Sequence, residues 1–333
     1  MATPLDAQGT TAEAQPEAIV SGVDKKAIQG RSLGQIAWMR LKRDKVAMTG
    51  GAVIVFLILM AIFGPMVIRA MGFDPLEFHQ DLIDPSTLAP KGTFGGMSIE
   101  HPFGIEPVNG RDIFSRIVEG AWISLLIAFL STLLSVVIGT ILGMTAGYVG
   151  GWVDTLISRT MDIFLAFPLL VFAIALVGVV SQFEADLDIK GNTLRIALLI
   201  FIIGFFNWPY IGRIIRGQTL SLREREFVDA SRSLGATPWY IVFRELLPNL
   251  IAPILVYSTL LIPSNILFEA ALSFLGVGVS PPTPTWGGML SEAVKFYTMP
   301  HFALYPGLAI FITVLAFNLF GDGLRDAFDP KAR

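Results

Sequence analysis

The sequence predicts an all-α, polytopic membrane protein with six transmembrane helices, and three observations carry this prediction. Of the 333 residues, 53% are hydrophobic and only 15% are charged, whereas soluble proteins average about 25% charged residues. The apolar residues are concentrated in long uncharged runs, and about 20 apolar residues in a helix span the hydrocarbon layer of a bilayer. The Lys and Arg residues gather in alternate connections between these runs, as expected of a chain that crosses a membrane repeatedly.

Six uncharged runs are long enough to be spans. The first, residues 46–68, follows a basic stretch between Arg40 and Lys45. The remaining five runs are 121–145, 163–183, 196–212, 246–268 and 302–321. The hydrophilic residues 184–188 favour a loop between the third and fourth spans, although one interrupted helical hairpin is the alternative.

The distribution of basic residues predicts the orientation of the chain. Six spans place both termini on the same side of the membrane, and 17 of the 24 Lys and Arg residues fall on that side. Six of them lie between Arg213 and Arg244. Since Lys and Arg are enriched in cytoplasmic loops, we expect both termini to be cytoplasmic.

The chain divides into four predicted parts. Residues 1–31 are expected to be a disordered cytoplasmic segment, because they offer no periodic apolar face to bury. Residues 32–118 hold the first span and a large external loop. Residues 119–323 form a five-helix core with a charged cytoplasmic loop at 217–248, and residues 324–333 are a cytoplasmic tail.

The residue types present exclude several kinds of chemistry. The chain has no Cys, and its three His residues show no metal-ligand spacing, so neither a metal site nor a catalytic site is predicted. It has no G-x-x-x-x-G-K-[ST] phosphate-binding loop, so we expect no ATP hydrolysis by this chain. No nucleic-acid partner is expected.

The charged cytoplasmic loop has the pattern of two short helices separated by a turn. Apolar residues recur near helical spacing on both sides of Gly235. After the glycine, Thr237 is a suitable N-cap and Pro238 a suitable first residue for a second helix. On this pattern alone, an amphipathic surface helix that joins two spans is an equally good interpretation.

The spacing of particular residues in this loop resembles a known motif. Asp229-Ala230-Ser231 is followed by three residues and Gly235, and Leu247-Pro248 comes later. This resembles the EAA loop of binding-protein-dependent ABC importer permeases, which reads Glu-Ala-Ala, three residues, Gly, nine residues, Ile, one residue, Leu-Pro. The sequence departs from that pattern at Asp229, Ser231 and Glu245, and the last departure affects only the expected packing there.

Further motifs are similar to the second permease subunit of the dipeptide, oligopeptide and nickel importers. They are His-Pro-Phe-Gly at 101–104, Gly-Arg-Asp-Ile-Phe-Ser-Arg at 110–116, Asp-Ile-Phe-Leu-Ala-Phe-Pro at 162–168, Glu-Ala-Ala-Leu-Ser-Phe-Leu-Gly at 269–276, and Gly-Asp-Gly-Leu-Arg-Asp at 321–326. Several matches in the same order identify the family more specifically than one motif does.

The resemblance implies the type I ABC importer permease fold in the inner membrane of a prokaryote. The expected partners are a homologous permease, two ATPase subunits that carry ATP and Mg, an external solute-binding protein and membrane lipid. The external loops 69–118 and 275–301 would contact the binding protein, and the charged loop would insert into the ATPase as a coupling helix. The residues assigned to this coupling are Glu226, Phe227, Asp229, Ala230, Ser231, Arg232, Leu234, Gly235, Leu247 and Pro248.

Two groups within the spans are also candidates for function. Gly139, Gly143 and Gly147 form a stripe of small residues suited to close helix packing, either within this chain or against the partner permease. The segment Asn207-Trp208-Pro209 is a possible pathway element, because proline frees a backbone carbonyl. An aromatic position at the membrane interface is the other interpretation.

The main alternative function is a stand-alone secondary transporter or channel, and a membrane enzyme has less support because no acid pair lies within the spans. The sequence leaves the solute open among dipeptides, oligopeptides, nickel complexes and others.

Overall fold

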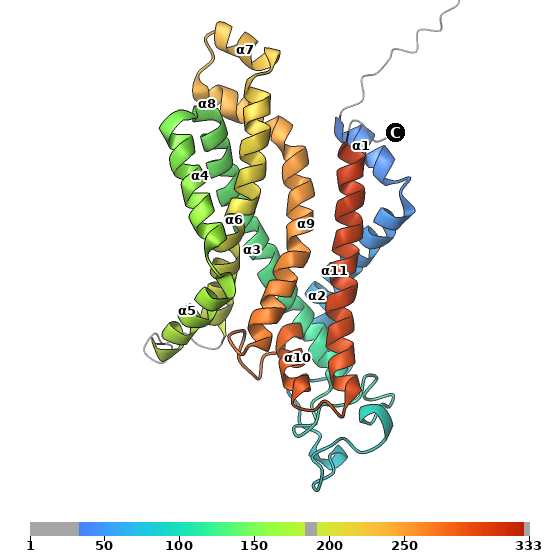
Figure 1. The fold of residues 1–333 in the computed structure, drawn as a ribbon. Helices are drawn as coiled ribbons and strands as arrows, with labels where there is room; N and C mark the ends of the chain where they lie inside the picture. The colour runs from blue at the N-terminus through green and yellow to red at the C-terminus, as the bar shows by residue number, and fades with distance from the viewer. Residues whose placement is uncertain (1–32, 184–191, 330–333) are drawn as a thin grey trace, which may run out of the picture.

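The computed structural model describes residues 33–183 and 192–329, and within these ranges the protein is helical with no β-strand (Figure 1). The sequence predicts a disordered segment at 1–31, a loop at 184–188 and a cytoplasmic tail at 324–333. The first two, and residues 330–333 of the tail, lie outside the described residues.

Five uninterrupted helical stretches of the described chain are apolar and long enough to cross a membrane, and a bent helix pair makes a sixth candidate. The ends of each stretch lie from a few residues to a few helical turns away from the ends of the corresponding predicted span. The five stretches are α2 (Lys45–Ala70), α3 (Ile113–Val149), α6 (Thr193–Arg223), the continuous stretch Pro238–Phe274, and α11 (Pro300–Phe328). That continuous stretch contains α8 (Pro238–Tyr240), the π-helical η3 (Ile241–Leu246) and α9 (Leu247–Phe274).

The third span differs from the prediction of one helix over 163–183. The chain instead forms α4 (Gly151–Ala166) and α5 (Leu169–Phe183), bent by 80° at the break between them. Pro168 explains the break, since proline disfavours helical backbone in the residue before it and Phe167 is extended, with ψ at 129°. The helix begins earlier than the predicted span because Asp154, Arg159 and Asp162 interrupt the uncharged run on which the prediction was based.

Several short elements were not predicted from the sequence. The helix α1 (Leu33–Leu41) packs on the end of α11. Residues 71–112, which we call the cap, contain the 3₁₀ turns η1 (Gln80–Leu82) and η2 (Thr93–Gly95). A last short helix, α10 (Trp286–Val294), lies between α9 and α11.

The helix α3 is the central packing element, and its contact with α6 is the most extensive in the chain. Three glycines on α3 make this contact close. A Cβ atom on Gly139 would lie 2.7 Å from the Trp208 carbonyl oxygen, and one on Gly143 would lie 2.6 Å from that of Gly212. The structure therefore places the small-residue stripe inside the chain, where backbone meets backbone as in other small-residue helix contacts.

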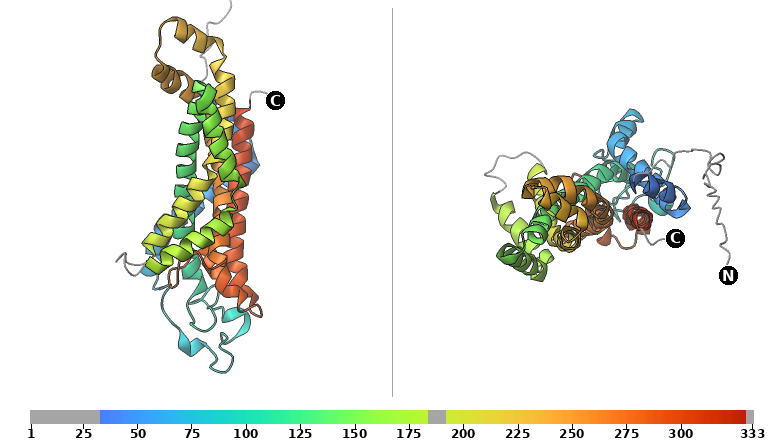
Figure 2. Two further views of the ribbon diagram at one scale, coloured as in Figure 1. Left: turned by 60° about the vertical axis from the view of Figure 1, so that its left-hand side comes forward. Right: turned by 90° about the horizontal axis from the view of Figure 1, so that it is seen from above.

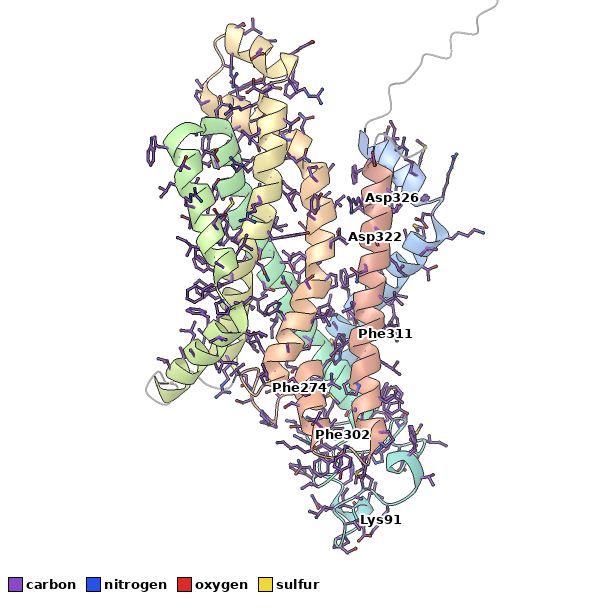
Figure 3. All side chains as sticks on the ribbon, in the orientation of Figure 1. Lys91, Phe274, Phe302, Phe311, Asp322 and Asp326 are labelled. Carbon is purple, nitrogen blue, oxygen red and sulfur yellow. The ribbon has the colours of Figure 1, made fainter. Side chains whose placement is uncertain are left out.

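The two ends of the molecule are built differently. One end, which we call the loop end, carries α7 (Glu226–Ser233), α8 and α1 (Figure 1). The other, the cap end, carries the cap and α10, with Lys91 near its tip and Asp322 and Asp326 far from it near the other end of α11 (Figure 3). Figure 2 shows α7 projecting beyond the helix ends in the side view.

The close approach of α3 to α6 predicts the effect of adding a single methyl group. Gly143→Ala should lower the free energy of unfolding by about 1–3 kcal/mol, because the added carbon overpacks a backbone contact. Gly217→Ala on α6 is the matched control, since nothing lies within 4 Å of its Cβ position. That variant should be neutral or stabilising by up to about 1 kcal/mol. Denaturant unfolding in mixed micelles measures both, and equal stability of the two variants would contradict the packing argument.

Candidate functional site

The predicted coupling loop is a helix, a glycine turn and a second helix. After α7, the amide of Gly235 donates to the Arg232 carbonyl at 2.9 Å and the amide of Ala236 donates to the Ser231 carbonyl at 3.0 Å. These two bonds form a Schellman motif, which needs a left-handed residue at the position of Gly235. Its φ is +82° and nothing lies within 4 Å of its Cβ position. Glycine is thus required at this position because of its backbone angle, and not because a side chain would lack space within this chain.

The second helix begins at the predicted residues. The Thr237 hydroxyl accepts a hydrogen bond from the amide of Tyr240 at 3.3 Å, and Pro238 occupies the first turn. The backbone then passes through η3 into α9 without a break. The loop is therefore joined directly to two spans, to α6 before it and to α9 after it.

A small apolar cluster holds the loop against the spans. Val228, Ile241 and Leu246 are fully buried together, and Phe227 and Tyr148 pack against them. Of the residues assigned to coupling, Phe227 thus belongs in part to this cluster, whereas Leu234 is 88% exposed.

The remaining assigned residues divide between the surface and the interior. Ser231 and Leu247 are partly buried, and Leu247 packs between α3, α6 and α9. The exposed members of the set are Glu226, Asp229, Ala230, Arg232, Gly235 and Pro248.

Two departures from the EAA pattern contact each other. The Ser231 hydroxyl donates to a carboxylate oxygen of Glu245 at 3.3 Å. The motif has alanine at the position of Ser231 and isoleucine at the position of Glu245, and these two residues would form an apolar contact in the same place. The two substitutions thus exchange an apolar contact for a hydrogen bond and preserve the link between α7 and η3.

Sequence reasoning missed the exposed aromatic side chains that follow the glycine turn. Trp239 is 73% exposed, and its ring centroid lies 4.2 Å from that of Phe243. Tyr240 is also half exposed. The spacing of four between Trp239 and Phe243 places both on one helix face, and this signal was available in the sequence.

Charged pairs fix the spans beneath the loop. Arg216 on α6 binds Asp154 on α4 through two hydrogen bonds, one of them 2.7 Å long. Arg223 donates to the Gly147 carbonyl at 3.0 Å and so satisfies the end of α3. The loop therefore rests on a braced group of three helices.

The middle of the helix bundle contains a buried polar junction. Asn207 on α6 donates to the Asn265 side-chain oxygen on α9 at 2.9 Å, and Asn265 donates to the Thr132 hydroxyl on α3 at 2.8 Å. Asn207 is partly exposed, while Trp208 and Pro209 are buried. In this conformation those two residues therefore face neighbouring side chains, and of the predicted segment only Asn207 reaches a surface.

The cap is attached through a buried ion cluster. Arg111 pairs with Glu106, and Arg116 lies 3.4 Å from Glu106 and 3.2 Å from Glu292 on α10. Asp112 instead caps α3, accepting from the Ser115 amide at 2.7 Å. Among the described residues no group of three or more His, Asp or Glu side chains is arranged to hold a metal ion.

The described residues thus form a helical membrane protein in which a capped glycine turn joins two spans, α6 and the stretch that contains α9. The chain belongs to the family described as the binding-protein-dependent transport system inner membrane component, which matches residues 139–333. Residues 32–90 match the N-terminal TM domain of oligopeptide transport permease C. The protein is accordingly a multi-pass inner-membrane permease of an ABC importer and a non-catalytic component. Membership of this family favours that function over a stand-alone transporter or channel.

Curated relatives extend over nearly the whole chain. The glutathione transport system permease protein GsiD of Shigella flexneri serotype 5b is 42% identical over 89% of this chain and 90% of its own length. The protein of the same name from Salmonella typhimurium is also 42% identical over the same shares. A structure of the inward-facing MetNI methionine ABC transporter has a TM-score of 0.50 at 20% identity, and the match covers 63% of this chain and 95% of that one. It shows the shared fold.

The polar junction predicts a measurable coupling between α6 and α9. In a double-mutant cycle, Asn207→Ala and Asn265→Ala should couple by about 0.6 kcal/mol and by no more than about 1.7 kcal/mol, the range known for hydrogen bonds within membranes. Unfolding in mixed micelles supplies the free energies.

Asn207→Ala combined with Asn249→Ala is the control cycle. Asn249 lies on the same helix as Asn265, roughly 24 Å away along its axis, and within the described residues its side chain bonds only to the nearby Glu245 carbonyl. The control cycle should be additive. If both cycles are additive, the contact between Asn207 and Asn265 does not stabilise the fold.

Proposed function

We propose that this chain is one of two homologous permease subunits in an importer for small peptides or related solutes. ATP hydrolysis takes place on two partner ATPases, which hold ATP and Mg, and a binding protein delivers the solute from outside. The loop end faces the cytoplasm, with both termini. The names of the relatives support glutathione-like peptides as the solute class.

The coupling loop is the observation that carries this proposal. Its glycine turn presents Leu234 at the tip and Trp239 beyond it, both largely exposed. Exposed apolar and aromatic side chains on a rigid turn are typical of the anchors that fill pockets on a partner protein. The charged residues Asp229 and Arg232 pair with each other at 3.3 Å and surround the tip with polar groups suited to the rim of such a contact.

The proposed mechanism follows from how the loop is connected. When the ATPases close, the turn moves with them, and the buried cluster around Val228 transmits the motion to α6 and α9. Because packed helices move as bodies, this produces the discrete rearrangement required for alternating access.

At the cap end, residues 71–112 and the connection from α9 to α10 are the proposed contacts for the binding protein. Arg111 of the cap and Arg116 of α3 both pair with Glu292 on α10, and Arg116 also donates to the Pro282 carbonyl in the connection, so these contacts hold the two segments together.

The turn can be tested by a graded series at Gly235. A left-handed backbone costs other residues about 1–3 kcal/mol, and each 1.4 kcal/mol is a tenfold change in a binding constant. Gly235→Val should therefore weaken ATPase docking roughly tenfold to a hundredfold and reduce uptake and stimulated ATP hydrolysis. Gly235→Asn should retain most activity, because asparagine tolerates this conformation. Reconstituted transporter with added binding protein supplies both activity measurements.

Gly151→Val is the matched control for that series. Gly151 also has positive φ, at +57°, with nothing within 4 Å of its Cβ position, and it is the first residue of α4. This variant should insert and remain active. Normal stimulation in Gly235→Val would refute the coupling role, and equal loss in both variants would show that backbone strain at this end harms the fold in general.

A further inference from the structure

A cavity lies within the cap, close to where the cap joins α2 and α3. Its volume is about 320 Å³, within the range of roughly 300–1,000 Å³ typical of ligand sites. All of the described residues that line it belong to the cap, from Met71 to Asp112, and none of them belongs to α6 or α9. The cavity is therefore a feature of the cap alone and not of the helix bundle.

The wall of this cavity carries negative charge, and no Lys or Arg is found among the described residues that line it. Four of its carboxylates belong to exposed residues, namely Asp74, Glu77, Asp81 and Glu100. None of the four forms a salt bridge within 4 Å in the part of the chain that the structure describes. The cavity therefore has a negative electrostatic potential, which attracts cations.

Two basic residues near the cavity do not cancel this charge. Arg69 at the end of α2 is matched by Glu119, whose carboxylate lies 3.6 Å away. Lys91 donates to the backbone carbonyl of Asp81 at 2.8 Å and does not line the cavity. Even when Lys91 is set against the Asp81 carboxylate, the two glutamates of the wall stay unmatched, and their carboxylates accept no hydrogen bond from the described residues.

A buried histidine in the same wall points to the same kind of ligand. The His101 side chain is 8% exposed, and its Nδ1 lies 3.1 Å from a carboxylate oxygen of Asp112. An ionised carboxylate only accepts, so Nδ1 donates and the Nε2 of the neutral ring keeps its lone pair. Nε2 has no hydrogen-bond partner among the described residues and is not closed off from solvent. Since His101 lines the cavity, this acceptor is available to a donor there.

The cavity is formed before any ligand arrives. The rings of His79 and His101 are in contact, with their centroids 4.6 Å apart. The His79 amide donates to the Gly110 carbonyl at 3.3 Å, and the Gln80 side chain donates to the Val108 carbonyl at 3.1 Å. These bonds join the first and last segments of the cap, so the walls are held in place.

The wall offers negative charge and hydrogen-bond acceptors, which complement a protonated amine or a guanidinium. A metal ion is a poorer match, because no three of the described His, Asp and Glu side chains are arranged to hold one. Because the described wall contains no residue of α6 or α9, the cation is presented by a molecule that docks on the cap.

We propose that this cavity receives a lysine or arginine side chain of the solute-binding protein, with Glu77 and Glu100 as the charged acceptors and His101 as the fixed one. The identity of the partner rests on the proposed function, whereas the existence of the cation site does not. Both basic side chains carry their charge at the end of a long stem, so they reach into the cavity from a protein that rests on its rim.

The site itself is tested with two peptides that differ in charge. Nα-acetyl-trilysine amide carries ammonium groups, and the same peptide with acetylated side chains carries none. Binding is measured by calorimetry on the full chain in phosphatidylcholine nanodiscs, within the assembly that co-purifies with it and without added binding protein. A charge-assisted hydrogen bond corresponds to about a tenfold change in a binding constant, so the wild type should prefer the charged peptide by about that factor at low salt.

Variants then locate the site. Glu77→Gln combined with Glu100→Gln, the glutamate variant, should lose the preference without affecting folding, because both residues are exposed. The control is Asp322→Asn combined with Asp326→Asn, which changes the net charge equally at two exposed residues far from the cap (Figure 3), and it should keep the preference. Equal binding of both peptides by the wild type, survival of the preference in the glutamate variant, or equal loss in the control overturns the proposal.

Docking of the purified binding protein identifies the source of the cation. The glutamate variant should bind it about tenfold more weakly than the wild type and the control do at low salt. The difference should shrink in about 0.5 M salt, which screens exposed charges. It should be the same for unliganded binding protein and for binding protein loaded with an N-acetylated solute. If it appears only with a solute that has a free amine, the cation belongs to the cargo and the assignment to the binding protein is wrong.

Failure of the proposed function gives a different result. If the binding protein does not dock on the wild type while the charged peptide still binds, the proposed partner is wrong and the cation site stands. If docking on the wild type is normal and the glutamate variant docks equally well, the cavity does not receive the binding protein and the proposal is overturned.

Discussion

The close contact between α3 and α6 is the interaction on which the rest of the structure depends. Lipid offers no hydrophobic force to drive helices together, so association relies on dispersion contacts, and these are strongest when backbones touch. The glycines at 139, 143 and 147 allow this along three successive turns of α3. The contact fixes the position of α6 along α3 and its rotation about its own axis. In that position Arg216 meets Asp154 on α4, and Arg223 reaches the end of α3.

The two ends of the bundle are stabilised by different interactions, and this difference fits the different tasks proposed for them. The cap end is held by ion pairs such as Arg116–Glu292 that are largely shielded from water, and a buried pair is costly to break once formed. The loop end has a small apolar cluster around Val228, and the aromatic side chains of Trp239, Tyr240 and Phe243 are exposed beside it. In the proposed function, a surface that would receive a binding protein benefits from fixed geometry, whereas a loop that would insert into a moving partner needs a rigid tip on a movable base.

The sequence predicted features that depend on local rules and missed those that depend on distant partners. The turn at Gly235 and the cap at Thr237 could be read directly, since each follows from the conformational preference of one residue type. The bend at Pro168 could be suspected, but its 80° angle could not, because most prolines inside the other spans leave their helices continuous. The contact of Ser231 with Glu245 was beyond reach, since it joins two departures from a motif that appear unrelated until the loop is folded.

The path from the coupling loop to the middle of the membrane is continuous, and this determines what can move. The loop is followed by one helical stretch from Pro238 to Phe274, so a displacement of the turn reaches α9 without a flexible joint. At mid-membrane Asn265 joins α9 to α6 and α3, so the three helices share that displacement. Pro263 lies two residues before this junction and removes a backbone hydrogen bond from α9. The missing bond, to the Thr259 carbonyl, lies on the loop side of Asn265, so any bend of α9 at this point is limited by the junction that joins α9 to α6 and α3.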